Sequence, residues 1–223
     1  MTEKVMVCPY FGQLPSWMDR WHDNIRRMTQ HGYTFVLDTD EDAFRDRVRE
    51  ILAIEPPRMY GTGRIWNFRP AFGLLYAHEI GDADFWGHTD FDCVYGKVED
   101  WVTDDFLNTV DIHADAPYVC GPWTLYRNTP VVNTLFFLAE EWEDRMTGDD
   151  YAHGWAEKGF TEVVDHSHAH GLIRRQYTRW QTTNLDDFSG LRLHADGSLT
   201  ERGTPVMMAH FRRTKQYPKG CVA

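Results

Sequence analysis

The sequence predicts a single-domain α/β fold with a mainly parallel central sheet. Strand-like and helix-like patterns alternate over residues 4–54, as is typical of parallel sheets whose crossovers are helices. A chain of 223 residues with 42% hydrophobic and 14% aromatic content can bury one sizeable core. No internal repeat, low-complexity segment or linker divides the sequence, so one domain is expected.

Two strand and helix pairs open the chain. The apolar run 4–12 ends in proline and glycine, which predicts a buried strand followed by a loop, and residues 33–40 form a second strand with an acidic end. Residues 15–32 and 41–54 predict amphipathic helices, the first capped by Ser16 and closed by Gly32. The apolar residues expected on their buried faces are Trp17, Trp21, Ile25 and Met28, then Phe44, Val48, Ile51 and Leu52.

Beyond these elements the pattern becomes less regular. A third helix is expected over residues 69–80, with Pro70 near its first turn, and a strand over residues 83–92 that ends in two aspartates. The remaining expectations are a helix over 98–110, a strand pair within 116–130, a helix over 130–146, a loop-rich region to about residue 190, and a hairpin turning at Asp196-Gly197.

Composition excludes several classes of protein. A formal net charge of -11 disfavours a broad surface for nucleic-acid phosphates. The four cysteines are far apart and form no CxxC pair, so reduced thiols are expected rather than disulfides or a zinc ribbon. The N-terminal apolar run is too short for a secretory signal, and no stretch approaches the ~18 apolar residues of a membrane span. These features favour a cytoplasmic protein.

The stretch "DFWGHTDFDCVYG" places Asp90 and Asp92 at the carboxyl end of a buried aromatic strand. Ligands bind outside the carboxyl ends of strands in open parallel sheets, and hard divalent cations take carboxylate oxygens together with substrate phosphates. An isolated DxD is most often a solvated acidic turn, but its place at this edge indicates a metal site.

Five short motifs in order, "CPYFGQLPSW", "TFVLDTD", "WNFRPAFGLLY", "DFWGHTDFDCVYG" and "MAHFRRTK", resemble those of the nucleotide-sugar-dependent glycosyltransferases of the GT-A fold, in particular a bacterial and phage-type group. The resemblance covers most of residues 4–137 and the C-terminal His-Phe. It implies a Rossmann-like GT-A sandwich, with a nucleotide-sugar-binding half over 1–100 and an acceptor half over 101–223 that ends in a metal-ligand strand.

The resemblance also assigns roles to individual residues. It implies metal ligation by Asp92 and His210, with Asp90 contacting ribose, the donor sugar or metal-bound water, and Mn²⁺ or Mg²⁺ as the cation. Arg212, Arg213 or Lys215 would neutralise the leaving diphosphate. The other nucleotide-sugar contacts implied are Pro9, Tyr10, Phe11 and Gly12 after the first strand, Thr39 and Asp40 at the base or ribose, and Arg69 near the diphosphate or the sugar.

Each assignment has a structural alternative. Tyr10 and Phe11 would be core aromatics, Asp40 would be the N-cap of the second helix, and His210 would be a hydrogen-bonded core histidine. For an inverting reaction the resemblance implies a general base among the acids after residue 150, for which Glu162 and Asp165 are candidates. Asp165 is favoured because it is closer to the polar stretch around His166, His168 and His170. These histidines would share one face of a strand and bind a transition metal, but an irregular loop is expected there instead.

The predicted function is transfer of a sugar from a nucleoside-diphosphate sugar, with a UDP-sugar as the favoured donor, to an acceptor hydroxyl. Two alternatives stay open: a metal-dependent nucleotide-sugar phosphohydrolase and a nucleotide-binding module without catalysis. The acceptor is equally open among a glycan, a small metabolite and a modified base of phage DNA.

Overall fold

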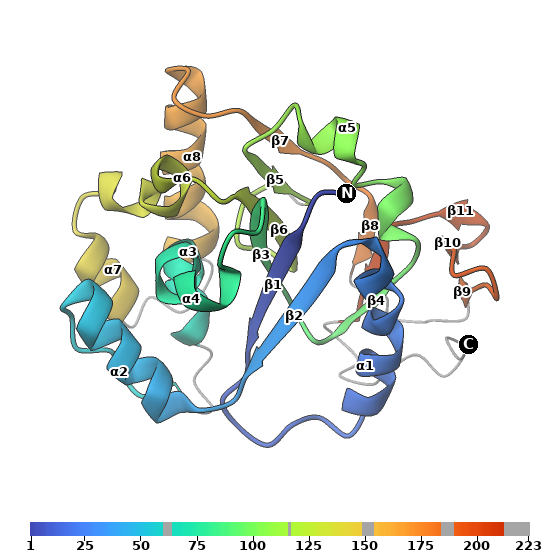
Figure 1. Cartoon of the computed structure of the whole chain (residues 1–223), viewed down its shortest axis with the longest axis horizontal. Helices are drawn as coiled ribbons and strands as arrows, with labels where there is room; N and C mark the ends of the chain where they lie inside the picture. The colour runs from blue at the N-terminus through green and yellow to red at the C-terminus, as the bar shows by residue number, and fades with distance from the viewer. Residues whose placement is uncertain (60–63, 116, 149–153, 184–189, 212–223) are drawn as a thin grey trace.

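A computed structural model of the chain describes residues 1–59, 64–115, 117–148, 154–183 and 190–211. Its centre is a six-stranded sheet in the order β2-β1-β3-β6-β5-β7, with helices on both faces (Figure 1). The strands of this sheet are β1 Lys4–Pro9, β2 Tyr33–Asp38, β3 Phe85–Thr89, β5 Ile112–Ala114, β6 Trp123–Arg127 and β7 Arg175–Tyr177.

The sheet is mainly parallel, as predicted. The strand β1 pairs in parallel with β2 and β3, and β5 pairs in parallel with β7. Only β6 runs the other way, because it pairs antiparallel with both β3 and β5. The carboxyl ends of the other five strands therefore meet at one edge, where Pro9 is paired with Asp38 and β3 ends at Thr89.

Two apolar layers cover the faces of the sheet, as alternation along β1 shows. Val5 and Val7 point into a core shared with α2, α3, α6 and α8, and Met6 and Cys8 point into a core shared with α1 and α5. This alternation is expected of a strand buried on both faces. The α-helices are α1 Met18–Arg26, α2 Glu41–Leu52, α3 Phe72–Leu75, α4 Ala77–Ile80, α5 Asp104–Leu107, α6 Pro130–Asn133, α7 Trp142–Thr147 and α8 Phe160–Ala169.

Two small sheets lie beside the central one. One has the order β4-β12-β8, with β4 Cys93–Tyr95, β8 Gln181–Thr183 and β12 Met208–His210. The other has the order β11-β10-β9, with β9 Leu191–Leu193, β10 Leu199–Glu201 and β11 Thr204–Pro205. The predicted hairpin is confirmed, since β9 and β10 pair antiparallel around a turn in which Gly197 has φ +88°. Only glycine adopts such a backbone conformation without strain.

Several expected elements differ in detail. Trp17 rather than Ser16 is the N-cap of α1, without a side-chain cap bond, and Ile51 is 43% exposed, because the buried stripe of α2 is centred on Phe44, Val48 and Leu52. The strand pair predicted within 116–130 is formed by β5 and β6, so its first strand precedes that range. By contrast Gly32, with φ +78°, ends the first helical region as expected.

Three of the predicted long helices are broken into short pieces. Pro70 lies inside the 3₁₀ segment η2 (Arg64–Ala71), and the α-helical part of 69–80 consists of α3 and α4, which are separated at Tyr76. The range 98–110 contains η3 (Val98–Asp100) and α5, and 130–146 contains α6, η4 (Leu135–Leu138) and the start of α7. The other short helical segments are the 3₁₀ turn η1 (Met28–His31) and the π-helical η5 (Gly154–Gly159).

The prediction of a loop after residue 150 is wrong for residues 160–169, because these residues form the helix α8. Phe160 and Val164 are buried on one side of this helix, so packing stabilises it although no side chain caps its N-terminus. In the described part of the chain, no helix has the length and apolar character needed to cross a membrane. The described cysteines, Cys8, Cys93 and Cys120, are free, and Cys221 lies outside the described residues.

Candidate active site

The two predicted carboxylates lie in the turn between β3 and β4. After β3 the backbone turns through Asp90, Phe91 and Asp92 into β4. Phe91 is buried between Tyr10 and Trp21, with ring centroids 5.4 and 4.7 Å away, so it holds the bend against the core. Asp90 and Asp92 are alternate residues, which share one face of an extended chain, so both carboxylates can serve one ion.

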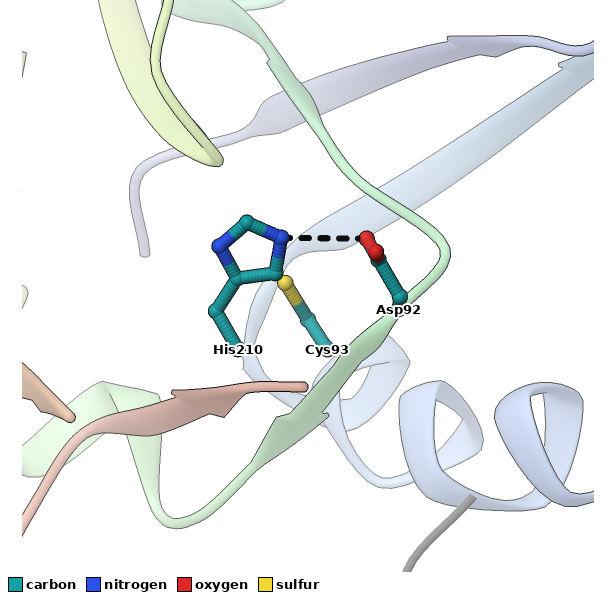
Figure 2. Close-up of side chains that lie close together, drawn as sticks. All are labelled: Asp92, Cys93 and His210. Atoms are coloured by element: carbon teal, nitrogen blue, oxygen red, sulfur yellow. Dashed lines mark ion pairs between the residues drawn. The ribbon is translucent and has the colours of Figure 1, made fainter. Parts of the chain in front are cut away.

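His210 reaches this bend from the far end of the chain. The strand β12 pairs antiparallel with β4, and the register places His210 opposite Cys93 (Figure 2). The Nε2 atom of His210 lies 3.2 Å from Oδ1 of Asp92 and 3.7 Å from Oδ2 of Asp90. One imidazole nitrogen therefore faces both carboxylates of the DxD, as the resemblance implied for a third metal ligand.

Cys93 is the third side chain close to Asp92 and His210. One ligand atom each from Asp92, Cys93 and His210 lies within 4.8 Å of the others, which makes them the group of possible ligands in the described part of the chain. Burial and then the charges of Asp92 and Asp90 raise the pKa of the Cys93 thiol well above its usual value. Hard cations such as Mn²⁺ and Mg²⁺ prefer oxygen and nitrogen donors to sulfur, so Asp92 and His210 are the side chains of this group that would suit them.

Arg69 lies on the other side of Asp90 and is only 8% exposed. Its Nη1 donates to the backbone carbonyls of Cys120 (2.7 Å) and Gly121 (3.2 Å), and its Nη2 donates to Oδ1 of Asp90. Burial alone would lower the pKa of Arg69, but the neighbouring Asp90 charge raises it above its usual value. The guanidinium is therefore a fixed positive charge beside the DxD.

The residues after β1 are placed partly in the core. Phe11 is 9% exposed and packs on Phe44 at 5.3 Å, whereas Tyr10 is half-buried against Phe91. Pro9 is the last residue of β1, and Gly12 follows in the loop with φ +156°. The structure thus supports the core alternative for Phe11 and leaves Pro9, Tyr10 and Gly12 at the carboxyl edge.

Asp40 takes the capping role that was the alternative to a nucleotide contact. Its Oδ1 accepts a hydrogen bond from the backbone N–H of Ala43 at 3.0 Å, which closes the first turn of α2. Both Thr39 and Asp40 are exposed at the carboxyl edge, next to the end of β2. A nucleotide contact by either residue stays a prediction.

The candidate bases lie on α8, away from direct contact with the DxD. Oδ1 of Asp165 accepts from the Tyr177 hydroxyl at 2.8 Å and forms an ion pair with Arg175 at 2.9 Å. Glu162 lines a pocket between α8 and α7 together with Arg145 and Trp155. Within the described residues, neither acid contacts Asp90 or Asp92. A role as base stays a prediction for both.

The three histidines do not form the shared face that a strand would give them, because successive alternate residues of a helix are ~200° apart. Instead Nδ1 of His168 contacts the carbonyl of Ile173, and the His166 and His170 rings lie with their centroids 4.1 Å apart and their planes tilted by 36°. They lie near the amino edge of the sheet, because Arg174, just before β7, binds Asp111, just before β5. The basic residues Arg212, Arg213 and Lys215 lie outside the described residues.

Sequence reasoning missed two features of this edge. The carbonyls that hold Arg69 belong to a turn in which Cys120 has φ +61°, and backbone groups carry no sequence signature. Asp115, fully buried after β5, was missed because a single aspartate in "HADAPY" matches no motif. Buried, unpaired carboxylates are the signal that would have identified it in a structure.

Comparisons with known proteins agree with the fold. A model of a protein family described as "Family of unknown function (DUF6625)" matches residues 6–187. A crystal structure of a glycosyltransferase involved in the glycosylation of the major capsid of PBCV-1 aligns with a TM-score of 0.53 and 10% identity, over 95% of this chain and 94% of that chain. At this identity the likeness shows the fold alone.

A second solved structure is the glycosyltransferase GlyE of Streptococcus pneumoniae TIGR4, with a TM-score of 0.42 and 14% identity over 100% of this chain and 58% of that chain. Its TM-score is too low for an argument about the fold. No curated protein matches the chain.

Proposed function

We propose that this chain, which belongs to the family of unknown function DUF6625, is a divalent-cation-dependent glycosyltransferase that uses a nucleoside-diphosphate sugar. The observation that carries the proposal is the convergence of Asp92 and His210, with Nε2 and Oδ1 3.2 Å apart, at the carboxyl edge of a mainly parallel sheet. This edge is where ligands of such sheets bind. The fold shared with a glycosyltransferase is consistent with the proposal.

The donor set fits a Mn²⁺ or Mg²⁺ ion that is shared with a substrate diphosphate. Asp92 and His210 would hold the ion, and two protein ligands leave most positions for phosphate oxygens and water, as is usual for these cations. When bound, such an ion stabilises the negative charge that develops on a leaving diphosphate. His210 is 7% exposed, so the protein positions its imidazole before any ligand arrives.

Arg69 and Asp90 would act on the donor beside the metal. The fixed guanidinium contributes positive charge near the diphosphate, and its bond to Asp90 orients that carboxylate towards the sugar or ribose. In this proposal residues 1–100 supply the nucleotide-sugar half, with Pro9, Tyr10 and Gly12 as the pocket edge. Residues 101–223 supply the acceptor half and return His210 to the metal site.

Product analysis tests the proposed function. The full chain is incubated with a panel of UDP-sugars and other nucleotide sugars, with Mn²⁺ or with excess chelator, and with glycan, small-molecule or phage-DNA acceptors. Transfer proceeds only with the cation and releases nucleoside diphosphate together with a glycosylated acceptor. Without any acceptor, release of nucleoside diphosphate with free sugar, or of nucleoside monophosphate with sugar 1-phosphate, would identify a hydrolase instead. The absence of any donor binding would refute the proposal.

If the transfer inverts the anomeric centre, the general base is proposed to be Asp165 or Glu162. We expect the amide variant of the base to bind donor normally while transfer slows by ~10²-fold or more, because a positioned base contributes on this scale. Asp165→Asn and Glu162→Gln are compared, with donor binding measured by calorimetry and transfer measured by product release. Wild-type rates in both variants would place the base elsewhere or indicate retention.

A further inference from the structure

Asp115 is a carboxylate buried at the same edge of the sheet as the DxD, and the proposed reaction does not use it. The backbone N–H of Asp90 binds the carbonyl of Pro122 at 3.2 Å, and that of Asp115 binds the carbonyl of Trp123 at 3.3 Å. The two aspartates therefore flank the start of β6. Asp115 is 0% exposed, and within the described residues no cation pairs with it.

Burying this carboxylate has a cost that its local bonds do not fully offset. Burial raises the pKa of Asp115 above its usual value, although hydrogen bonds from Trp180, Thr178 and Gln181 act in the opposite direction. Its Oδ2 has no hydrogen-bond partner within the described residues. An apolar residue of similar size would avoid this cost but would leave the N–H of Trp180 and the hydroxyl of Thr178 without this acceptor, so the carboxylate is explained by the bonds that it accepts.

The hydrogen bonds that the oxygens of Asp115 accept all come from one short segment. Its Oδ1 accepts from the backbone N–H of Trp180 at 2.7 Å and from the hydroxyl of Thr178 at 3.0 Å. Its backbone carbonyl accepts from the side-chain amide of Gln181. These partners lie between the end of β7 in the central sheet and the start of β8 in the small sheet. Asp115 thus fixes the point at which the chain leaves the central sheet.

This segment in turn holds the strand that carries His210. The carbonyl of Trp180 accepts from the backbone N–H of Met207 at 2.7 Å, one residue before β12. The strand β8 then pairs in parallel with β12, placing Gln181 opposite Met208 and Thr183 opposite His210. On its other side β12 pairs with β4 at the DxD bend. His210 is therefore set between β4 and a strand whose origin is held by Asp115.

We propose that Asp115 is a positioning residue for the metal site. It holds His210 opposite Asp92 through Trp180, Met207 and the pairing of β8 with β12. The proposal rests on the proposed function only where His210 is taken as a metal ligand. Groups that orient a metal ligand from outside the first coordination shell change metal affinity by about 10–100-fold when they are removed.

Substitutions at Asp115 separate positioning from charge. Asp115→Asn keeps an oxygen that accepts from Trp180 and Thr178, and its amide takes the place of the unpartnered Oδ2. We expect Mn²⁺ affinity within roughly 3-fold of wild type for this variant, below the outer-shell range. Asp115→Ala removes the acceptor and should weaken Mn²⁺ binding by roughly 10–100-fold. Thr178→Val removes one of the two hydrogen bonds to Oδ1 of Asp115, so its Mn²⁺ affinity should lie between those of Asp115→Asn and Asp115→Ala.

Asp111→Ala is the matched control, because Asp111 precedes the same strand at its other end. It accepts hydrogen bonds from Arg127 and Arg174 and is not linked to β8, so its loss should lower stability without changing Mn²⁺ affinity. Two quantities are measured on each full-length variant: Mn²⁺ affinity by calorimetry, and the NMR shift of the His210 imidazole without metal. The NMR measurement tests the positioning of His210 even if the wild-type chain does not bind Mn²⁺, an outcome that would refute the proposed metal site alone.

We expect Asp115→Ala to shift the His210 resonance and to weaken Mn²⁺ binding. Asp115→Asn should restore both to wild-type values, and Asp111→Ala should change neither. An unchanged His210 resonance in Asp115→Ala would overturn the proposal, as would equal effects in Asp111→Ala or a failure of Asp115→Asn to recover. If Asp115→Ala does not fold, Thr178→Val decides: an unchanged His210 resonance in that variant refutes the positioning role.

Discussion

Replacing Asp92 by alanine should abolish cation-dependent donor turnover while leaving the fold intact. Asp92 is one of the two proposed metal ligands, so its loss should weaken Mn²⁺ binding by roughly 100-fold or more, beyond the range for groups that only orient a ligand. Its side chain is half-buried, whereas its backbone carbonyl, which accepts from the N–H of Phe211 at 2.8 Å, is retained in the variant. Mn²⁺ affinity by calorimetry and thermal unfolding of the apo chain measure the two effects separately.

His210→Ala and His168→Ala extend this test to the histidines. His210 faces Asp92, whereas His168 contacts the carbonyl of Ile173 near the opposite edge of the sheet. His210→Ala should therefore weaken Mn²⁺ binding and His168→Ala should not. The reverse order would move the metal site to α8, and full donor turnover by Asp92→Ala in excess chelator would contradict the metal dependence itself.

The central sheet could be predicted because local patterns determine its strands. The run from Lys4 to Pro9 alternates between two apolar layers, and Asp40 and Gly32 mark helix ends by their capping chemistry. The segment 160–169 was misread because its polar, histidine-rich sequence has β-branched residues and no cap, and the helix depends on burying Phe160 and Val164. Local propensity does not reveal such tertiary stabilisation.

The sequence pointed to the proposed ligands of the candidate site, but not to the residues that hold those ligands in place. The resemblance identified Asp92 and His210, although only the pairing of β4 with β12 shows that they meet. The support from Asp115 depends on which backbone groups reach it through the β7 to β8 connection. Unlike the local cap at Asp40, these bonds join groups that are far apart in the sequence, so only the folded chain shows which of them meet.

Removing the guanidinium of Arg69 should have the largest effect on stability among the site variants. In Arg69→Met the carboxylate of Asp90 and the carbonyls of Cys120 and Gly121 lose their donor in a buried setting. Breaking a buried pair by removing one partner costs about 3–5 kcal/mol. For a chain of this size that corresponds to a fall in Tm of roughly 10 °C, measurable by thermal unfolding.

A double-mutant cycle with Asp90 tests the cause of this loss. Asp90→Asn added to Arg69→Met removes the uncompensated charge, so the double variant should recover part of the lost free energy of unfolding. Arg47→Met is the matched control, because Arg47 pairs with Glu79 at 2.7 Å, both side chains are 26% exposed, and its guanidinium lies over the ring of Tyr76. Its loss should cost about 1 kcal/mol or less. Equal losses of unfolding free energy in Arg69→Met and Arg47→Met would show that Arg69 contributes no more than a partly exposed ion pair. Additive losses in the double variant would show that Arg69 does not compensate the charge of Asp90.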